Sequence, residues 1–434
     1  MHAHEPVFDP KAVIEGRPPG GHRAGLIAVI VLAAFCAIIV LGIDVLQSVA
    51  TGRSVVPFLV ALPFALAPVP LLVAAVLLLD RLEPEPRANL TLAFLWGAGV
   101  AALLAVVINT AGMQYVTQPA LGATSGEYVS ATAGAPVVEE SLKGLVLVGL
   151  LRWRRQELDG PTDGVIYAAM VGLGFAMTEN IGYYMGAFVS PAHGGVRLLA
   201  YTFVLRGVLS PLLHPIFTSM TGLGAAYTAS HRHAGWALPL GWLAAMLLHA
   251  LWNGLSIFGL AGVAVAYAIL QGVLVLILAV LVADRRKVVR LITRFLPGYA
   301  PTGLVTQADV RMLSTLRGRR RARSWARSAG GLPAAAAMGD YQLAATELAL
   351  LHQKAERGVI SPVRFAARQQ ALLALMRRAR GEFLRRRAQP PPAPWAVHGG
   401  SGFTRPAAPA APVALPAMPQ RREPRRPGRR SSPG

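Results

Sequence analysis

Two adjacent carboxylates and an ammonium group lie in the first half of an otherwise apolar stretch, residues 135–151. The motif is Glu139-Glu140-x-x-Lys143, and the stretch is long enough to form a membrane-spanning helix. A charge at the centre of a bilayer costs roughly 2.5 to 3.5 kcal/mol on insertion scales. Three such charges must therefore face other protein groups or a water-filled cavity. On a helix Lys143 lies one turn from both glutamates, so it can neutralise one and leave the other to act as a general base on water.

Three other apolar stretches also contain ionisable or amide side chains. They hold Glu179 with Asn180, His214, and His249 with Asn253. A second buried carboxylate, Glu179, could share a proton with the first pair or position a water molecule with it. His249 and Asn253 are four residues apart, on one face of a helix, and both can donate hydrogen bonds to the oxyanion that forms during acyl transfer. These residue types therefore predict hydrolysis of an acyl bond.

Each of these groups also has a structural interpretation. The two glutamates and Lys143 could be an ion-pair cluster between helices, His214 could be a packing residue, and Asn253 could form an interhelical hydrogen bond. Other protease signatures do not occur in the sequence, which lacks a His-Glu-x-x-His motif, a serine beside a base in a nucleophile motif and a pair of intramembrane aspartates.

The composition indicates a polytopic membrane protein. Hydrophobic residues make up 54% of the 434 residues and charged residues only 15%, against about 25% in soluble proteins. The net charge of +21 is concentrated in short loops on one side and in the C-terminal tail. This distribution favours anionic lipid at the cytoplasmic face, rather than nucleic acid, as the acidic partner. The single cysteine, Cys36, excludes an intramolecular disulfide.

The hydropathy predicts an all-α bundle of about eight transmembrane helices in a cell membrane. They are expected near residues 26–48, 55–79, 89–109, 131–151, 163–188, 202–229, 236–258 and 260–283. Positive charge alternates between the connections, so both termini are predicted to be cytoplasmic. With a long connection at 110–130 on the outside, the polar groups of the fourth, fifth and seventh spans fall at one level in the outer half of the membrane.

The predicted organisation has four parts. Residues 1–25 form a cytoplasmic segment and residues 26–283 the transmembrane domain. Residues 284–388 form a basic cytoplasmic region, in which apolar positions at helical spacing predict a helical hairpin broken near Gly358 and Pro362. Residues 389–434, rich in Pro, Ala and Arg, are predicted to be disordered.

At these motifs the chain resembles the PrsW family of intramembrane proteases, part of the wider clan of CAAX prenyl endopeptidases and bacteriocin-processing proteins. The resemblance rests on Glu139-Glu140-x-x-Lys143, Phe175-x-x-x-Glu179-Asn180, His214, His249-x-x-Trp252-Asn253 and the turn at residues 79–86, and covers about residues 55–260. It implies cleavage of a membrane-tethered protein, which for the founding type is an anti-sigma factor.

The resemblance also implies residue roles. Glu139 would activate water, Glu140 would support it, and His249 with Asn253 would bind the oxyanion. Glu179 and His214 complete the expected catalytic set, with Lys143 and Asn180 in support. A metal-dependent version also stays open, with Zn²⁺ held by Glu139, His214 and His249.

Two rival functions remain open at the level of the sequence. One is a proton-coupled transporter, because buried Glu and His also mark ion pathways. The other is a catalytically inactive membrane scaffold that acts through its tail. The sequence does not set the oligomeric state.

Overall fold

The computed structural model describes residues 10–14, 23–50, 54–79, 84–158, 160–190 and 195–384. Within these residues every regular element is a helix, so the predicted all-α fold is confirmed. The chain divides into two compact units, one from residues 17–286 and one from residues 1–16 with 287–434. The predicted tail at 389–434 lies outside the described residues, as do most of the segment 1–25 and residues 80–83 of the turn.

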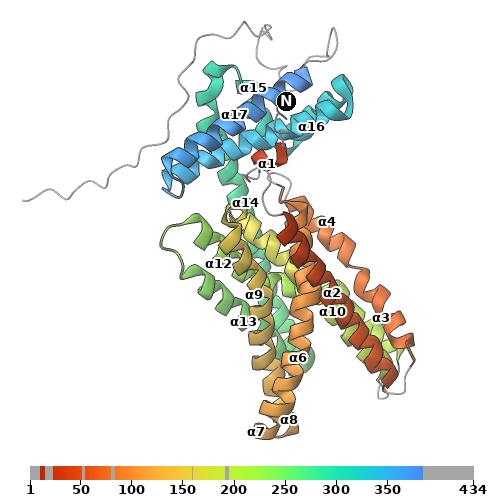
Figure 1. Cartoon of the computed structure of the whole chain (residues 1–434). Coiled ribbons are helices and arrows are strands. Elements are labelled where there is room, and N and C mark those ends of the chain that lie inside the picture. Colours follow the sequence, from red (N-terminus) through yellow and green to blue (C-terminus); the bar gives the residue numbers. More distant parts are fainter. Residues whose placement is uncertain are drawn as a thin grey trace, which may run out of the picture. The chain divides into compact units, whose positions relative to one another are not determined.

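The unit of residues 17–286 contains the apolar helices (Figure 1). Its first part comprises α2 (Arg23–Ala50), α3 (Val56–Leu66), α4 (Val69–Leu79), α5 (Arg87–Leu95), η1 (Trp96–Ala101), α6 (Ala102–Gly112), η2 (Met113–Thr117), α7 (Gln118–Leu121), α8 (Ala123–Val129), η3 (Ser130–Gly134) and α9 (Ala135–Trp153). Its second part comprises η4 (Arg155–Glu157), α10 (Pro161–Val189), α11 (Val196–Phe203), η5 (Val204–Leu209), α12 (Leu213–Ser230), α13 (Ala237–Ser256) and most of α14 (Gly259–Phe295).

Among the described residues, seven helical stretches are long and apolar enough to cross a membrane. They are Ala24–Ala50, Val56–Leu79, Arg87–Leu121, Pro161–Val189, Val196–Ser230, Ala237–Ser256 and Gly259–Thr302. The remaining predicted span, the fourth at residues 131–151, is α9, whose 19 residues have sufficient length but include Glu139, Glu140 and Lys143. Its charges, rather than its length, set it apart from the others. The protein is therefore a multi-pass membrane protein.

The second unit shows why α9 should count as a crossing. Its short N-terminal helix α1 (Pro10–Ile14) packs against α16 (Leu316–Glu356) and α17 (Pro362–Leu384), which follow the apolar helices in the chain. Segments packed together lie on one side of a membrane, so the chain between α1 and α16 crosses an even number of times. The seven apolar helices together with α9 give eight.

The second unit is held together by an apolar core of its own. Besides α1, α16 and α17 it contains η6 (Leu296–Thr302) and α15 (Gln307–Leu313). Helix α16 changes direction at Gly331, which has a φ of 75° that side chains disfavour. After α16, Gly358 (φ 65°) starts the turn into α17, and the two helices pack along each other. Buried aromatic and aliphatic residues such as Tyr341, Leu348 and Phe365 fill the space between them.

In the first unit, α10 is the central helix. It is mostly buried and packs against α12, α3, α5, α4 and α9. Glycines permit the closest of these approaches: a Cβ on Gly172 would lie 2.5 Å from the backbone nitrogen of Pro215, and Gly164 faces Gly222 in the same way. This close contact between α10 and α12 brings Glu179 and His214 onto adjacent surfaces.

The connection expected at residues 110–130 is helical instead. The third span continues through η2 and α7 to Leu121, the chain turns at Gly122 (φ 82°), and α8 and η3 lead without a break into α9. Residues 110–130 contain a single proline, Pro119, at the start of α7, so little prevents the helices from extending. The start of the helix therefore does not mark the depth of Glu139.

Candidate active site

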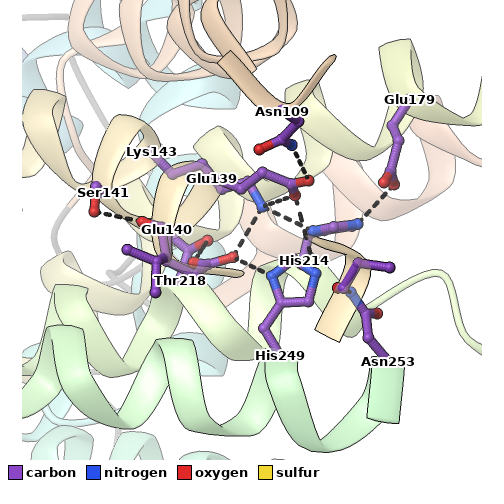
Figure 2. A network of polar contacts seen from close by, with 12 residues as sticks. Asn109, Glu139, Glu140, Ser141, Lys143, Glu179, His214, Thr218, His249 and Asn253 are labelled. Atoms are coloured by element: carbon purple, nitrogen blue, oxygen red, sulfur yellow. Dashed lines mark hydrogen bonds and ion pairs between the residues drawn. The ribbon is translucent and has the colours of Figure 1, made fainter. Parts of the chain in front are cut away.

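The site begins with Glu140, which is fully buried on α9. Its Oε1 atom lies 2.8 Å from Nζ of Lys143 and 3.1 Å from Nδ1 of His249. Its Oε2 atom accepts a hydrogen bond of 3.0 Å from the hydroxyl of Thr218 on α12. All of these contacts stabilise a carboxylate, so Glu140 links α9 to α12 and α13 (Figure 2).

Glu139 is the less constrained of the two glutamates. Its Oε2 atom is 3.4 Å from Nζ of Lys143 and 3.9 Å from Nε2 of His249, both longer than the contacts of Glu140. Its Oε1 atom accepts a hydrogen bond of 3.3 Å from the amide of Asn109 on α6. Adjacent residues differ by about 100° around a helix, which is why the neighbours reach different partners.

Lys143 lies between the two carboxylates and His214. Its Nζ atom is 2.9 Å from Nδ1 of His214 and 3.7 Å from the centre of the Phe175 ring. The side chain is fully buried, so its charge depends on these partners for stabilisation. The motif of α9 is therefore both an ion-pair cluster and a contact with α10 and α12.

His214 joins this cluster to Glu179 of α10. Its Nε2 atom lies 2.9 Å from Oε2 of Glu179, and the same oxygen accepts a bond of 2.5 Å from Nη2 of Arg206 in η5. Arg206 also donates through Nε to Oδ1 of Asn180 at 2.6 Å. Its guanidinium covers the ring of Tyr183 at 3.7 Å. Asn180 thus supports Arg206 rather than a carboxylate.

A small cavity opens onto these groups. It is lined by residues of α10, η5, α12, α13 and the turn between η5 and α12, namely Ala176, Glu179, Asn180, Tyr183, Arg206, Ser210, Pro211, Leu213, His214, Phe217, His249, Trp252 and Asn253. The bundle thus places a polar wall, from Glu179 to His249, beside a space that can hold water.

Asn253 lines the cavity but does not join the network. Its amide donates a hydrogen bond of 2.8 Å to the carbonyl oxygen of Ala131 in η3. This bond ties α13 to the helix that leads into α9, and one amide proton remains for another acceptor. Figure 2 shows Asn253 beside the linked residues rather than among them.

Two contacts of the site were not predicted. Asn109 binds Glu139 and Arg206 binds Glu179. The sequence places Asn109 at the end of the predicted span 89–109 and Arg206 inside the predicted span 202–229, and no role was assigned to either residue. A polar residue inside an apolar run is the signal that could have identified them, because intramembrane charges and amides require partners.

The residues suit a metal ion. One ligand atom from each of Glu139, His214 and His249 lies within 4.8 Å of the others, and all three residues are buried. Each histidine has one nitrogen against a carboxylate, Glu179 for His214 and Glu140 for His249, which is the arrangement that orients metal-binding imidazoles. The ammonium of Lys143 contacts two of the three residues, so it would compete with a cation for them.

Fold and site together define a polytopic α-helical membrane protein with a buried centre of carboxylates and imidazoles. Residues 85–283 match the model of the family described as "PrsW family intramembrane metalloprotease". The chain is 30% identical over 143 residues to a protein named protease PrsW of Geobacillus kaustophilus, a match that covers 33% of this chain and 55% of the relative. It is also 30% identical over 128 residues to protease PrsW of Oceanobacillus iheyensis, covering 29% and 54%.

The chain thus spans about half the length of the curated relatives that it matches. No solved structure matches the chain. The region that matches the PrsW family model, residues 85–283, contains Glu139, Glu179, His214 and His249.

Proposed function

We propose that the protein is an intramembrane peptidase that hydrolyses a peptide bond of a membrane-tethered protein, with water activated at Glu139. The observation that carries this proposal is the convergence of Glu139, His214 and His249 from three helices onto one centre beside the cavity. The names of the relatives, both proteases, support the same activity. An anti-sigma factor is one candidate substrate.

In this proposal Glu139 takes the proton of the attacking water and later passes it to the leaving amine. Glu140 holds His249 through Nδ1, so that Nε2 faces Glu139. An imidazolium at His249, stabilised by Glu140, and the remaining amide proton of Asn253 would donate to the oxyanion. In the metal-dependent alternative, Glu139, His214 and a neutral His249 would hold Zn²⁺, which would supply activation of the water and polarisation of the peptide carbonyl in place of these roles.

The test compares membrane-released fragments from cells that carry the wild type or a variant. Glu139→Gln and His249→Ala should each lower fragment release by about 10²- to 10⁴-fold, the usual contribution of a proton-transferring group. Glu127→Gln makes the same chemical change at an exposed position of α8 and should leave release unchanged. Equal release from wild type and Glu139→Gln, with both proteins inserted, would overturn the proposal.

We also propose that both termini lie in the cytoplasm and that the basic face of the second unit contacts anionic lipid. Arginines 317, 320, 321 and 327 of α16 are exposed there. Reporter fusions at either end should be active only on the cytoplasmic side. In nanodiscs, phosphatidylserine should slow hydrogen exchange at residues 316–327, and no change on adding it would contradict the lipid contact.

A further inference from the structure

The helix that crosses as residues 196–230 is interrupted beside the site. The π-helical segment η5 ends at Leu209 and α12 begins at Leu213. No backbone N–H from residue 210 onward bonds to the carbonyl oxygens of residues 206–209: Ser210 N bonds to Leu205 O, and Leu213 N bonds to Ser210 O. Pro211 supplies no N–H at all. Four successive acceptors are therefore left without backbone donors among the described residues.

Such a gap is costly inside a membrane. Hydrocarbon offers no donors, so irregular backbone at membrane depth occurs where it is buried in protein or lines a water-filled cavity. Here Arg206, Ser210 and Pro211 line the cavity that also contains His214 and His249. We call residues 206–212 the open turn.

The groups of the open turn suit a peptide backbone. The carbonyl oxygens of residues 206–209 can accept hydrogen bonds from a peptide, and the guanidinium of Arg206, which binds Asn180 and Glu179, lines the same cavity. A regular helix offers neither free N–H groups nor free carbonyl groups along its length. A segment of unwound chain offers both.

We propose that the open turn binds the backbone of an unwound segment of the substrate and holds it beside Glu139 and His249. Residues that break a helix, such as Gly and Pro, would then select the bond that is cut. This inference rests on the proposed function. If the open turn served only to orient His214, the protein would bind helical and unwound peptides equally well.

The probes are two synthetic single-span peptides of equal length, one with a Gly-Pro pair in the span and one with Leu-Leu at the same positions. The full-length Glu139→Gln protein carries a photoreactive phenylalanine in place of Val208, which is 57% exposed. After reconstitution in vesicles, the Gly-Pro peptide should cross-link about tenfold more than the Leu-Leu peptide, as expected from two backbone hydrogen bonds. Equal cross-linking of the two peptides would overturn the inference.

Pro211→Ala gives the matched test of the backbone. It supplies an N–H that can close onto the carbonyls of the open turn, and it should reduce Gly-Pro cross-linking to the Leu-Leu level. Pro215→Ala alters a proline in the regular first turn of α12 and should leave the preference intact. A preference that survives Pro211→Ala in a folded protein contradicts the inference, and the comparison of the two peptides stands even where Pro211→Ala fails to fold.

Hydrolysis by the protein with Glu139 intact is measured in parallel. If neither peptide is hydrolysed but the cross-linking preference persists, the proposed function fails and the binding inference stands. If both peptides are hydrolysed at equal rates and cross-link equally, the activity stands and the binding inference fails.

Discussion

The Nδ1 atom of His249 lies 3.1 Å from Oε1 of Glu140, although the two residues are 109 positions apart in the sequence. An ionised carboxylate only accepts hydrogen bonds, so Nδ1 carries a proton and Nε2 is directed toward Glu139. The pair fixes the orientation of the imidazole, and Glu140 also contacts Lys143 and Thr218.

Loss of Glu140 should therefore destabilise the protein more than loss of Glu139. Glu140→Gln leaves the buried Lys143 without its nearest carboxylate, and breaking such a pair typically costs about 3–5 kcal/mol. Glu139→Gln removes only the longer contact to Lys143 and should lower the thermal unfolding temperature less. Adding Lys143→Met to Glu140→Gln should restore part of the loss. Equal unfolding temperatures for the two single variants would contradict this assignment.

Metal content gives a second prediction. Purified protein should retain about one divalent ion, measured by plasma mass spectrometry after dialysis, and His214→Ala or His249→Ala should abolish retention. Glu179→Gln should weaken metal affinity by about 10- to 100-fold, as is usual for a carboxylate that orients a histidine ligand. Lys143→Met should strengthen it, because the competing ammonium is removed.

The control for the metal experiment is Asn253→Ala, which alters the cavity without removing a proposed ligand. Metal retention that is the same in wild type, His214→Ala and His249→Ala would leave Glu139 as a base that acts without metal.

The contact between α10 and α12 can be tested at a glycine. In Gly172→Ala the added methyl group would lie 2.5 Å from the nitrogen of Pro215 and 2.7 Å from the carbonyl carbon of His214. Overpacking of this kind costs roughly 1–3 kcal/mol, and it should separate His214 from Glu179 and lower activity. Gly182→Ala in the same helix meets no atom within 4 Å and serves as the control. Unfolding temperature and fragment release should both fall for the first variant alone.

The second unit should lose stability in mild acid. Burial lowers the pKa of His352 from 6.5 to about 4, and the ring stacks on Phe295 and contacts the hydroxyl of Tyr299 at 2.7 Å. Between pH 6.5 and pH 4 the unfolded chain binds a proton that the folded one does not, so stability falls as the pH is lowered. Hydrogen exchange in residues 341–356, corrected for its intrinsic pH dependence, should therefore quicken from pH 7 to pH 5.

The matched variant is His352→Gln, which keeps a hydrogen-bonding group near Tyr299 but does not titrate in this range. Its exchange rates should depend less on pH. An unchanged pH dependence would assign the effect to other groups.

The helical bundle and the match of residues 85–283 to the PrsW family model could be predicted because their signals are local. Hydropathy marks apolar helices one at a time, and an intramembrane charge such as Glu139 or His249 stands out against its neighbours. The hydrogen-bond partners of these charged side chains are harder to predict from the sequence. Asn109 donates a hydrogen bond to Glu139, and Asn253 donates one to the carbonyl oxygen of Ala131. Both contacts depend on how the helices are rotated and how they cross, which the sequence does not show.

The helices between residues 113 and 134 were not predicted, for a different reason. Hydropathy reports where apolar sequence stops, but a helix continues into polar sequence until a residue such as Gly122 ends it. The depth inferred for Glu139 rested on the end of the apolar sequence, and it remains a prediction.

The short helix α1 has a consequence for biogenesis. Arg368 on α17 binds the carbonyl oxygens of Val13 and Ile14, and Ile14 precedes Arg368 by 354 positions in the chain. The ribosome makes Val13 and Ile14 before the apolar helices and Arg368 after all of them. The second unit can therefore complete its fold only after every apolar helix has been synthesised, so membrane insertion precedes this contact.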